Sequence, residues 1–149
     1  MAISDEELRV ALSNEEPDYP ALAARLDESD VPRVRALAER DDLALATKAI
    51  YLASLLASDS AHEIVVRAAD SPTELKRIAS ATGLPNLPPL PRERAASRLA
   101  DEPNPAVAKM VLRAIDQPSP QLVEKIRAME SRATVPEIRA LAREKLRDR

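Results

Sequence analysis

Side chains that could perform chemistry are few in this sequence and are not grouped. The single histidine, His62, has no cysteine and no second histidine to share a metal ion with, which favours a structural or solvated role. Adjacent carboxylates occur at Glu15-Glu16, Asp41-Asp42 and Asp101-Glu102. Each pair lies in a predicted turn or at a predicted helix end, where capping and solvation explain it better than acid–base catalysis. We therefore expect no catalytic residue and no metal site.

Cofactor chemistry is equally restricted. One glycine excludes the glycine-rich loops that cradle nucleotide phosphates, and the absence of cysteine excludes thiolate chemistry. Lys48 and Tyr51 lie one helical turn apart and could form a polar site, although a lysine whose alkyl chain covers a half-buried tyrosine is the favoured interpretation. We expect a protein that is not an enzyme and that holds no cofactor.

Polar side chains at one-turn spacing on four predicted helices form the first candidate binding surface. They are Thr47, Tyr51 and Ser54, then Lys76, Arg77 and Ser80, then Lys109 and Arg113, and finally Arg139 and Arg143. Tyr51 and the six lysines and arginines are the candidate binding residues, because helices lying side by side would join them into one basic groove. The alternative is that these charges only face water.

The second candidate surface is the proline-rich segment 83–91, GLPNLPPLP. Pro85, Pro88 and Pro91 have the three-residue spacing that aromatic-lined grooves recognise in polyproline segments. Four prolines in nine residues predict an extended connection that is neither helix nor paired strand. A rigid spacer between two helix pairs is the favoured alternative to a recognition site.

Length, composition and charge predict one folded domain spanning residues 1–149. The chain is 45% hydrophobic and 32% charged, with a net charge of −3. Residues 1–30 carry nine acids and two bases, whereas residues 91–149 carry nine acids and thirteen bases, so the two ends differ electrically. No basic segment followed by an apolar one opens the chain; we therefore expect no signal peptide and a cytoplasmic location.

The other helices of the chain are expected to pack around the stretch 43–57, LALATKAIYLASLLA. Twelve of its fifteen residues are apolar, so a helix here would be apolar on nearly every side and would need neighbours on both flanks. A bilayer-spanning helix needs about 20 apolar residues, so these neighbours are expected to be other helices of the same chain and not lipid.

Helix starts are marked by capping boxes and prolines. Capping boxes are predicted at Ser4–Glu7, Ser60–Glu63, Ser71–Glu74 and Thr134–Glu137. Pro20, Pro105 and Pro120 are expected in the first turn of further helices, and Gly83 is expected to end one. Together with the apolar spacing, these signals predict ten short helices of about fifteen residues each, turn included.

Two parts of the sequence resemble each other in addition to this regular succession of short helices. Residues 31–38 (VPRVRALA) and 135–142 (VPEIRALA) are identical at six of eight positions. The stretches 42–56, 104–112 and 135–143 are similar to the second-helix pattern of HEAT repeats, and the chain resembles that family over roughly residues 30–147. The stretch 116–126 is more similar to the leucine-rich-variant repeat, a related alternative. The resemblance implies an all-α, right-handed solenoid of about five antiparallel helix pairs whose second helices line the concave face.

The function that this resemblance implies is a non-enzymatic protein–protein interaction module that uses the concave face as a scaffold. Its basic residues suggest an acidic protein partner, and the charge difference between the ends suggests weak head-to-tail self-association. One alternative is a nucleic-acid binder with a basic concave groove, which a sequence pI near 5.3 and the absence of Trp and Phe oppose. Another is an accessory protein of the lyase or chaperone type that the family includes.

Overall fold

All regular structure in the computed structural model, which describes residues 2–147, is helical. The ten helices are α1 (Asp5–Ser13), α2 (Tyr19–Ala24), α3 (Val31–Ala38), α4 (Leu43–Leu55), α5 (Asp59–Ala68), α6 (Glu74–Gly83), α7 (Pro89–Leu99), α8 (Pro105–Ala114), α9 (Pro120–Arg132) and α10 (Pro136–Leu146). Two short 3-10 helices, η1 (Glu28–Asp30) and η2 (Leu84–Asn86), precede α3 and α7. The predicted all-α class is confirmed. Within residues 2–147, every helix is too short or too polar to cross a membrane.

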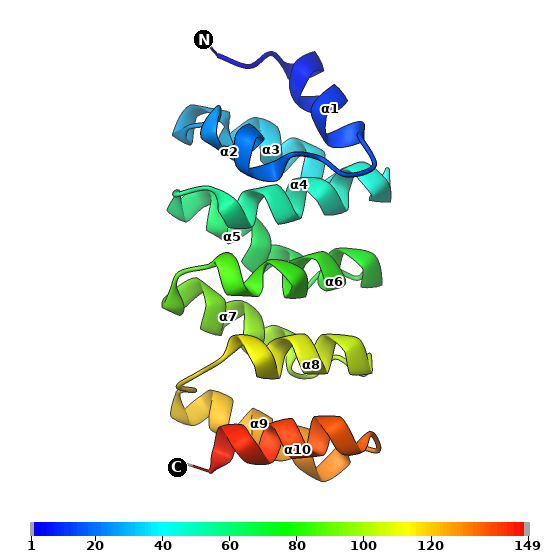
Figure 1. The fold of residues 1–149 in the computed structure, drawn as a ribbon, viewed down its shortest axis with the longest axis vertical. Coiled ribbons are helices and arrows are strands. Elements are labelled where there is room, and N and C mark those ends of the chain that lie inside the picture. Colours follow the sequence, from blue (N-terminus) through cyan, green and yellow to red (C-terminus); the bar gives the residue numbers. More distant parts are fainter. Residues whose placement is uncertain (1, 148–149) are drawn as a thin grey trace.

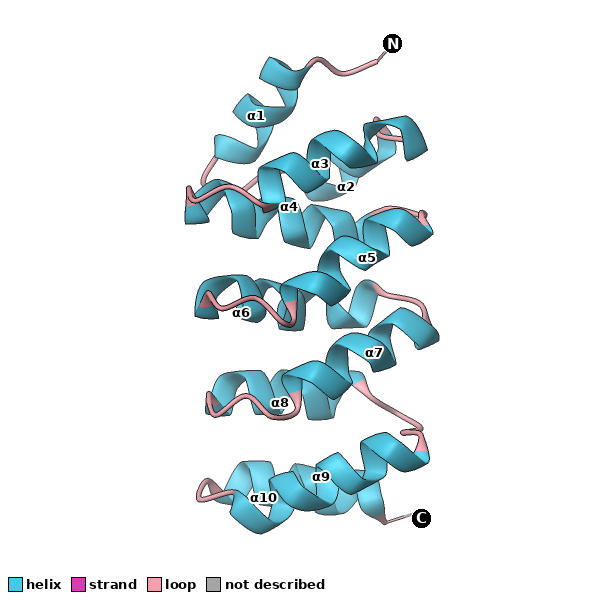
Figure 2. Cartoon of the chain, turned by 180° about the vertical axis from the view of Figure 1, so that it is seen from behind, coloured by secondary structure: helices cyan, strands magenta, loops and turns pink. Residues whose placement is uncertain are grey.

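The helices lie in two rows along the long axis of the molecule. In one row α4, α6, α8 and α10 follow one another, each in contact with the next, and in the other row α3, α5, α7 and α9 do the same. Figure 1 shows the two chain ends at opposite ends of this stack, and Figure 2 shows the second row from behind. At the N-terminal end, α1 and α2 both contact α4.

The predicted central helix is α4, and it is surrounded as its composition requires. It contacts α1, α2, α3, α5 and α6. Ala46, Ala49, Leu52 and Ala53 are fully buried along it, and their mostly small side chains allow the neighbouring helices to approach closely. The prediction that this stretch needs helices on both flanks is confirmed.

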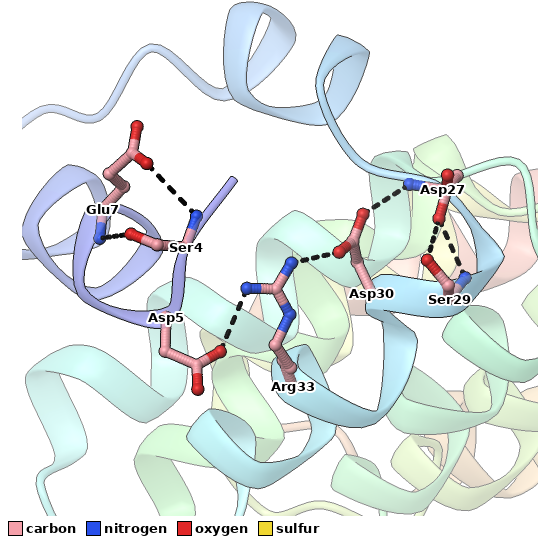
Figure 3. Close-up of polar contacts among 7 residues, drawn as sticks. All are labelled: Ser4, Asp5, Glu7, Asp27, Ser29, Asp30 and Arg33. Carbon is pink, nitrogen blue, oxygen red and sulfur yellow. Dashed lines mark hydrogen bonds and ion pairs between the residues drawn. The ribbon is translucent and has the colours of Figure 1, made fainter. Parts of the chain in front are cut away.

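One of the four predicted capping boxes is present. The backbone N–H of Glu7 donates to the Ser4 hydroxyl at 3.1 Å, and the Ser4 N–H donates to the Glu7 carboxylate at 3.2 Å (Figure 3). The Glu7 pKa is lowered, first by the Ser4 N–H and then by Arg25. The predicted start of α1 is therefore confirmed in detail.

The other three predicted boxes were wrong, since α5 is capped by a different serine and α6 and α10 have no side-chain cap. α5 begins earlier than predicted, since Ser58 accepts from the Ala61 N–H and Ser60 instead bonds to Glu28. α6 begins at Glu74, after Ser71 has formed a turn with the Thr73 N–H. α10 begins after Val135 with no side-chain cap. The proline starts of α2, α8 and α9 are confirmed.

The proline-rich segment 83–91 is not extended, contrary to prediction. Residues Leu84–Asn86 form η2, and α7 begins at Pro89, so only Leu87 and Pro88 lie outside a helix. Leu84 and Leu87 are both fully buried. Prolines are accommodated because a residue in the first turn of a helix has no intrahelical use for its N–H. Gly83, Leu84 and Leu87 therefore anchor the segment in the core, whereas Pro85, Asn86 and residues 88–90 are exposed.

A regular spacing underlies the first row. The helices α4, α6, α8 and α10 begin at residues 43, 74, 105 and 136, which are 31 residues apart in each case. The similar stretches 31–38 and 135–142 do not follow this spacing, because they form α3 of one row and α10 of the other. The two stretches therefore do not occupy equivalent positions along the stack.

Candidate functional site

An open apolar hollow lies where α2 meets the first two helices of the α4 row. It encloses about 710 Å³, and its apolar walls come from Tyr19, Leu43, Tyr51, Leu75 and Ile78. We call it the α4–α6 groove. Leu75 is 50% exposed although it is a large aliphatic residue. Water therefore reaches apolar surface here that a partner could cover.

An aromatic pair forms one wall of the groove. The rings of Tyr19 and Tyr51 meet edge to face, with centroids 4.8 Å apart and planes at 71°. Asp18 places Tyr19 by accepting a hydrogen bond from the Ala21 N–H at 3.2 Å, which fixes the start of α2. Burial raises the pKa of the Tyr19 hydroxyl, and Tyr51 adds to this effect, so Tyr19 stays neutral at physiological pH. The pair is a rigid, amphipathic contact surface of the kind that interfaces favour.

Lys48 is the one charged side chain among the described residues that line this groove. Its ammonium group donates to the backbone carbonyl of Asn14 at 2.6 Å, which links α4 to the segment between α1 and α2. Lys48 and Tyr51 are both half-buried. The favoured interpretation of this pair, an alkyl chain beside a half-buried tyrosine, agrees with this placement.

A second hollow of about 380 Å³ adjoins the groove along the same row. Thr82 lines both hollows, and its hydroxyl lies 3.7 Å from the sulfur of Met110 on α8. Arg113 and Asp116 are at this second hollow as well. The two hollows thus run from α2 across α4 and α6 to α8 on one face of the stack.

Two of the candidate cations converge on one carboxylate. Lys109 and Arg113 of α8 lie 2.7 and 2.8 Å from the carboxylate of Glu137 on α10. The pKa of Glu137 is lowered, chiefly by the hydrogen bond from Lys109 and then by the charges of Lys109 and Arg113. The cluster keeps one net positive charge, and it joins the last two helices of the row.

Three further candidates are engaged within the fold. Arg77 donates to Glu102 at 2.5 Å and to the Ser71 carbonyl at 2.8 Å, so it holds the turn between α7 and α8. Arg139 donates to the Ala133 carbonyl, and Arg143 to Glu130. None of the three lines the α4–α6 groove or the hollow beside it. Lys76 lies at a different hollow, on the other row of helices.

The seven candidate binding residues therefore do not form one continuous stripe. Tyr51 lies in the groove, Arg113 lies at the hollow next to it, and Lys109 shares Glu137 with Arg113. Ser54 and Ser80, of the same predicted stripes, are buried.

Sequence reasoning missed Tyr19, Leu43 and Leu75. Leu75 is half-exposed, whereas Ala79, Ser80 and Gly83 face the core. Leu75 and Ala79 are four residues apart and lie on the same side of α6, so the spacing of apolar residues gave no signal that separates the exposed leucine from the buried alanine.

His62 is buried on α5, as the structural interpretation favours. Its Nε2 lies 2.6 Å from the Leu56 carbonyl, and its Nδ1 has no partner within the described part of the chain. No group of three or more metal-ligating side chains occurs in residues 2–147. Comparison with models of known protein families, with curated proteins and with solved structures finds no match for the chain.

Proposed function

We propose that this protein is a non-enzymatic interaction module that binds a partner protein in the α4–α6 groove. The observation that carries the proposal is the groove itself, an open apolar hollow of about 710 Å³ in which a half-exposed leucine faces a tyrosine pair. Tyrosine and exposed apolar surface are both enriched where proteins meet partners.

The fold that supports this function is an α-solenoid of about five antiparallel helix pairs, similar to HEAT repeats. Supporting this are the two rows of helices and the 31-residue spacing of α4, α6, α8 and α10. In such a stack each repeat contacts mainly its neighbours, and one row presents a long, rigid surface. The groove lies on the row that begins with α4.

The partner proposed for this surface is an amphipathic helix with acidic flanks. A helix laid into a groove contributes apolar side chains at i, i+3, i+4 and i+7, which fits a wall made of Tyr51, Leu75 and Ile78. The charges along the same face are mainly positive. Lys48 lies in the groove, and Arg92, Lys109 and Arg113 lie beyond it, opposed by Glu137 and Asp116. Charge complementarity therefore selects glutamates or aspartates beside the apolar stripe.

A peptide-binding titration tests the proposal. The probe is a synthetic helix with leucines at i, i+3, i+4 and i+7 and glutamates at the remaining surface positions, compared with the same peptide carrying lysines. We expect the acidic peptide to bind more tightly, and Leu75→Asp to weaken it by roughly tenfold or more because a carboxylate then enters an apolar contact.

The matched control is Leu90→Asp. Leu90 is 77% exposed on α7 and lies outside the groove, so its substitution should leave peptide binding unchanged. Melting curves of both variants verify that the fold is intact. Equal affinity of the wild type and Leu75→Asp for the acidic peptide, or preference for the basic peptide, would overturn the proposal.

A further inference from the structure

A separate hollow of about 550 Å³ lies on the other row of helices, where the C-terminal turns of α3, α5 and α7 meet the start of α6. It shares no lining residue with the α4–α6 groove. Side chains of Ala38, Ile50, Ile64 and Ala68 contribute apolar surface to it. Its volume falls within the range of roughly 300–1,000 Å³ that small-molecule sites occupy.

The rim of this hollow is basic. Four cationic side chains line it, Arg35 of α3, Arg67 of α5, Lys76 of α6 and Arg98 of α7, against two carboxylates, Glu39 and Asp70. Arg98 lies 2.9 Å from Asp70 and 3.2 Å from the Val66 carbonyl, so Asp70 is already paired. The other three cations have Glu39 as the one remaining carboxylate of the lining.

Those three cations differ from most others in that they have no hydrogen-bond or ion-pair partner among the residues that the structure describes. Within residues 2–147, the lysine and arginine side chains that make neither an ion pair nor a hydrogen bond are Arg35, Arg40, Arg67, Lys76 and Arg147. Three of these five line the same hollow. Most other cations of the described residues are paired, whereas three of the four around this hollow are not.

The positive field at this place also acts on a neighbouring carboxylate. The pKa of Glu63 on α5 is lowered, first by its hydrogen bonds from Arg94 and further by the charges of Arg98 and Arg67. Two cations of the rim therefore act over a distance on a group outside the hollow. A negatively charged ligand inside it would meet the same charges at closer range.

We propose that this hollow is a binding site for an organic phosphate, with Arg35, Arg67 and Lys76 holding the phosphate group and the apolar surface holding the organic part. A phosphate monoester carries nearly two negative charges at neutral pH, which matches several unpaired cations better than one carboxylate does. Guanidinium groups bind its oxygens through paired, charge-assisted hydrogen bonds. The phosphate alone would leave most of the cavity and its apolar surface unused.

The test is isothermal titration of the full-length protein with phenyl phosphate, inorganic phosphate and a phosphoserine peptide. We expect phenyl phosphate to bind more tightly than inorganic phosphate, and Arg67→Gln and Lys76→Gln each to weaken it by roughly tenfold, as loss of a charge-assisted hydrogen bond implies. A phosphoserine peptide that binds more tightly than phenyl phosphate would support the same site and assign the phosphate to a protein side chain.

Arg40→Gln is the matched control, since Arg40 is equally unpartnered but does not line the hollow. Its affinity for phenyl phosphate should equal that of the wild type. The proposal is overturned if the wild type binds none of the three probes, if Arg40→Gln weakens binding as much as Arg67→Gln, or if inorganic phosphate binds as tightly as phenyl phosphate.

Discussion

Gly83 of α6 lies so close to Ser54 of α4 that a β-carbon on Gly83 would be 2.8 Å from the Ser54 β-carbon. Gly83 has φ −82° and ψ −8°, a conformation open to any residue. The glycine is therefore required by the close approach of two helices and not by a turn. Since α4 and α6 form the walls of the α4–α6 groove, this contact sets their separation.

Replacing Gly83 with alanine is expected to destabilise the protein by about 1–3 kcal/mol, because the added methyl group must displace a fully buried neighbour. Chemical denaturation of the purified variant measures the change. In the Ser54→Gly background the same substitution should be much less harmful, since the clashing β-carbon is gone. Additive effects in this double-mutant cycle would show that the two residues do not compete for space.

Elements whose signal is local could be predicted from the sequence. The start of α1 follows from the Ser4 and Glu7 pair. α4 follows from an apolar run that is too continuous to fit on one face of a helix. Gly83 was correctly placed at the end of α6, but for the wrong reason, because the contact with Ser54 joins residues far apart in the chain.

The candidate site was less predictable because it depends on how helices are brought together. Tyr19 reaches Tyr51 across the packing of α2 on α4, which nothing in either segment encodes alone. From the sequence, Arg77 was expected to face solvent, yet the carboxylate of Glu102, in the turn after α7, forms an ion pair with it. Pairing partners of this kind are set by the stacking of helices and not by periodicity.

The Arg77–Glu102 pair provides a test of structural against binding roles. The Glu102 side chain is only 5% exposed and that of Arg77 is 23% exposed. Removing the carboxylate in Glu102→Ala leaves a poorly hydrated guanidinium, so we expect a loss of about 1–3 kcal/mol in the free energy of unfolding. Arg143→Gln breaks a pair in which Arg143 is 65% exposed and should change stability by less than about 0.5 kcal/mol. Similar melting temperatures for both variants would contradict this assignment.

Acid should loosen the N-terminal end of the stack. Asp30 accepts from the Asp27 N–H at 2.9 Å and from Arg33, which also donates to Asp5 of α1 at 3.0 Å (Figure 3). The pKa of Asp30 is lowered by the Asp27 N–H first and by Arg33 next. A lowered pKa means that this stabilisation is fully present above the ordinary carboxyl pKa of about 4 and is lost as the pH falls through the lowered value.

Thermal unfolding between neutral and strongly acidic pH measures this effect. Asp30→Asn should be less stable than the wild type at neutral pH, and the difference should shrink as the pH falls below about 4, because the wild-type carboxyl is then protonated as well. Asp41→Asn, at an exposed aspartate before α4, should show no such convergence. A constant difference across the pH range would mean that the charge of Asp30 is not what stabilises this end.

The two ends of the stack are expected to attract each other between molecules. Residues 1–30 carry a net charge of −7 and residues 91–149 carry +4, and the chain ends lie at opposite ends of the molecule (Figure 1). Arg139 and Arg143 are exposed on the last helix, where an acidic end could reach them. Contact of one end with the other is heterologous and does not close on itself, so the expected product is a weak, concentration-dependent head-to-tail association.

Sedimentation velocity at low and high salt tests this expectation, because exposed charges are screened within about 10 Å at 0.1 M salt. Arg139→Glu/Arg143→Glu should abolish the low-salt association, and so should Glu15→Lys/Glu16→Lys. Mixing the two variants should restore the association, because the wild-type N-terminal end of one meets the wild-type C-terminal end of the other, and the two reversed ends also carry opposite charges. Asp59→Lys, a charge reversal at an exposed position on α5 in the middle of the stack, should associate as the wild type does. A wild type that stays monomeric at low salt, or variants that associate unchanged, would show that these charges only face water.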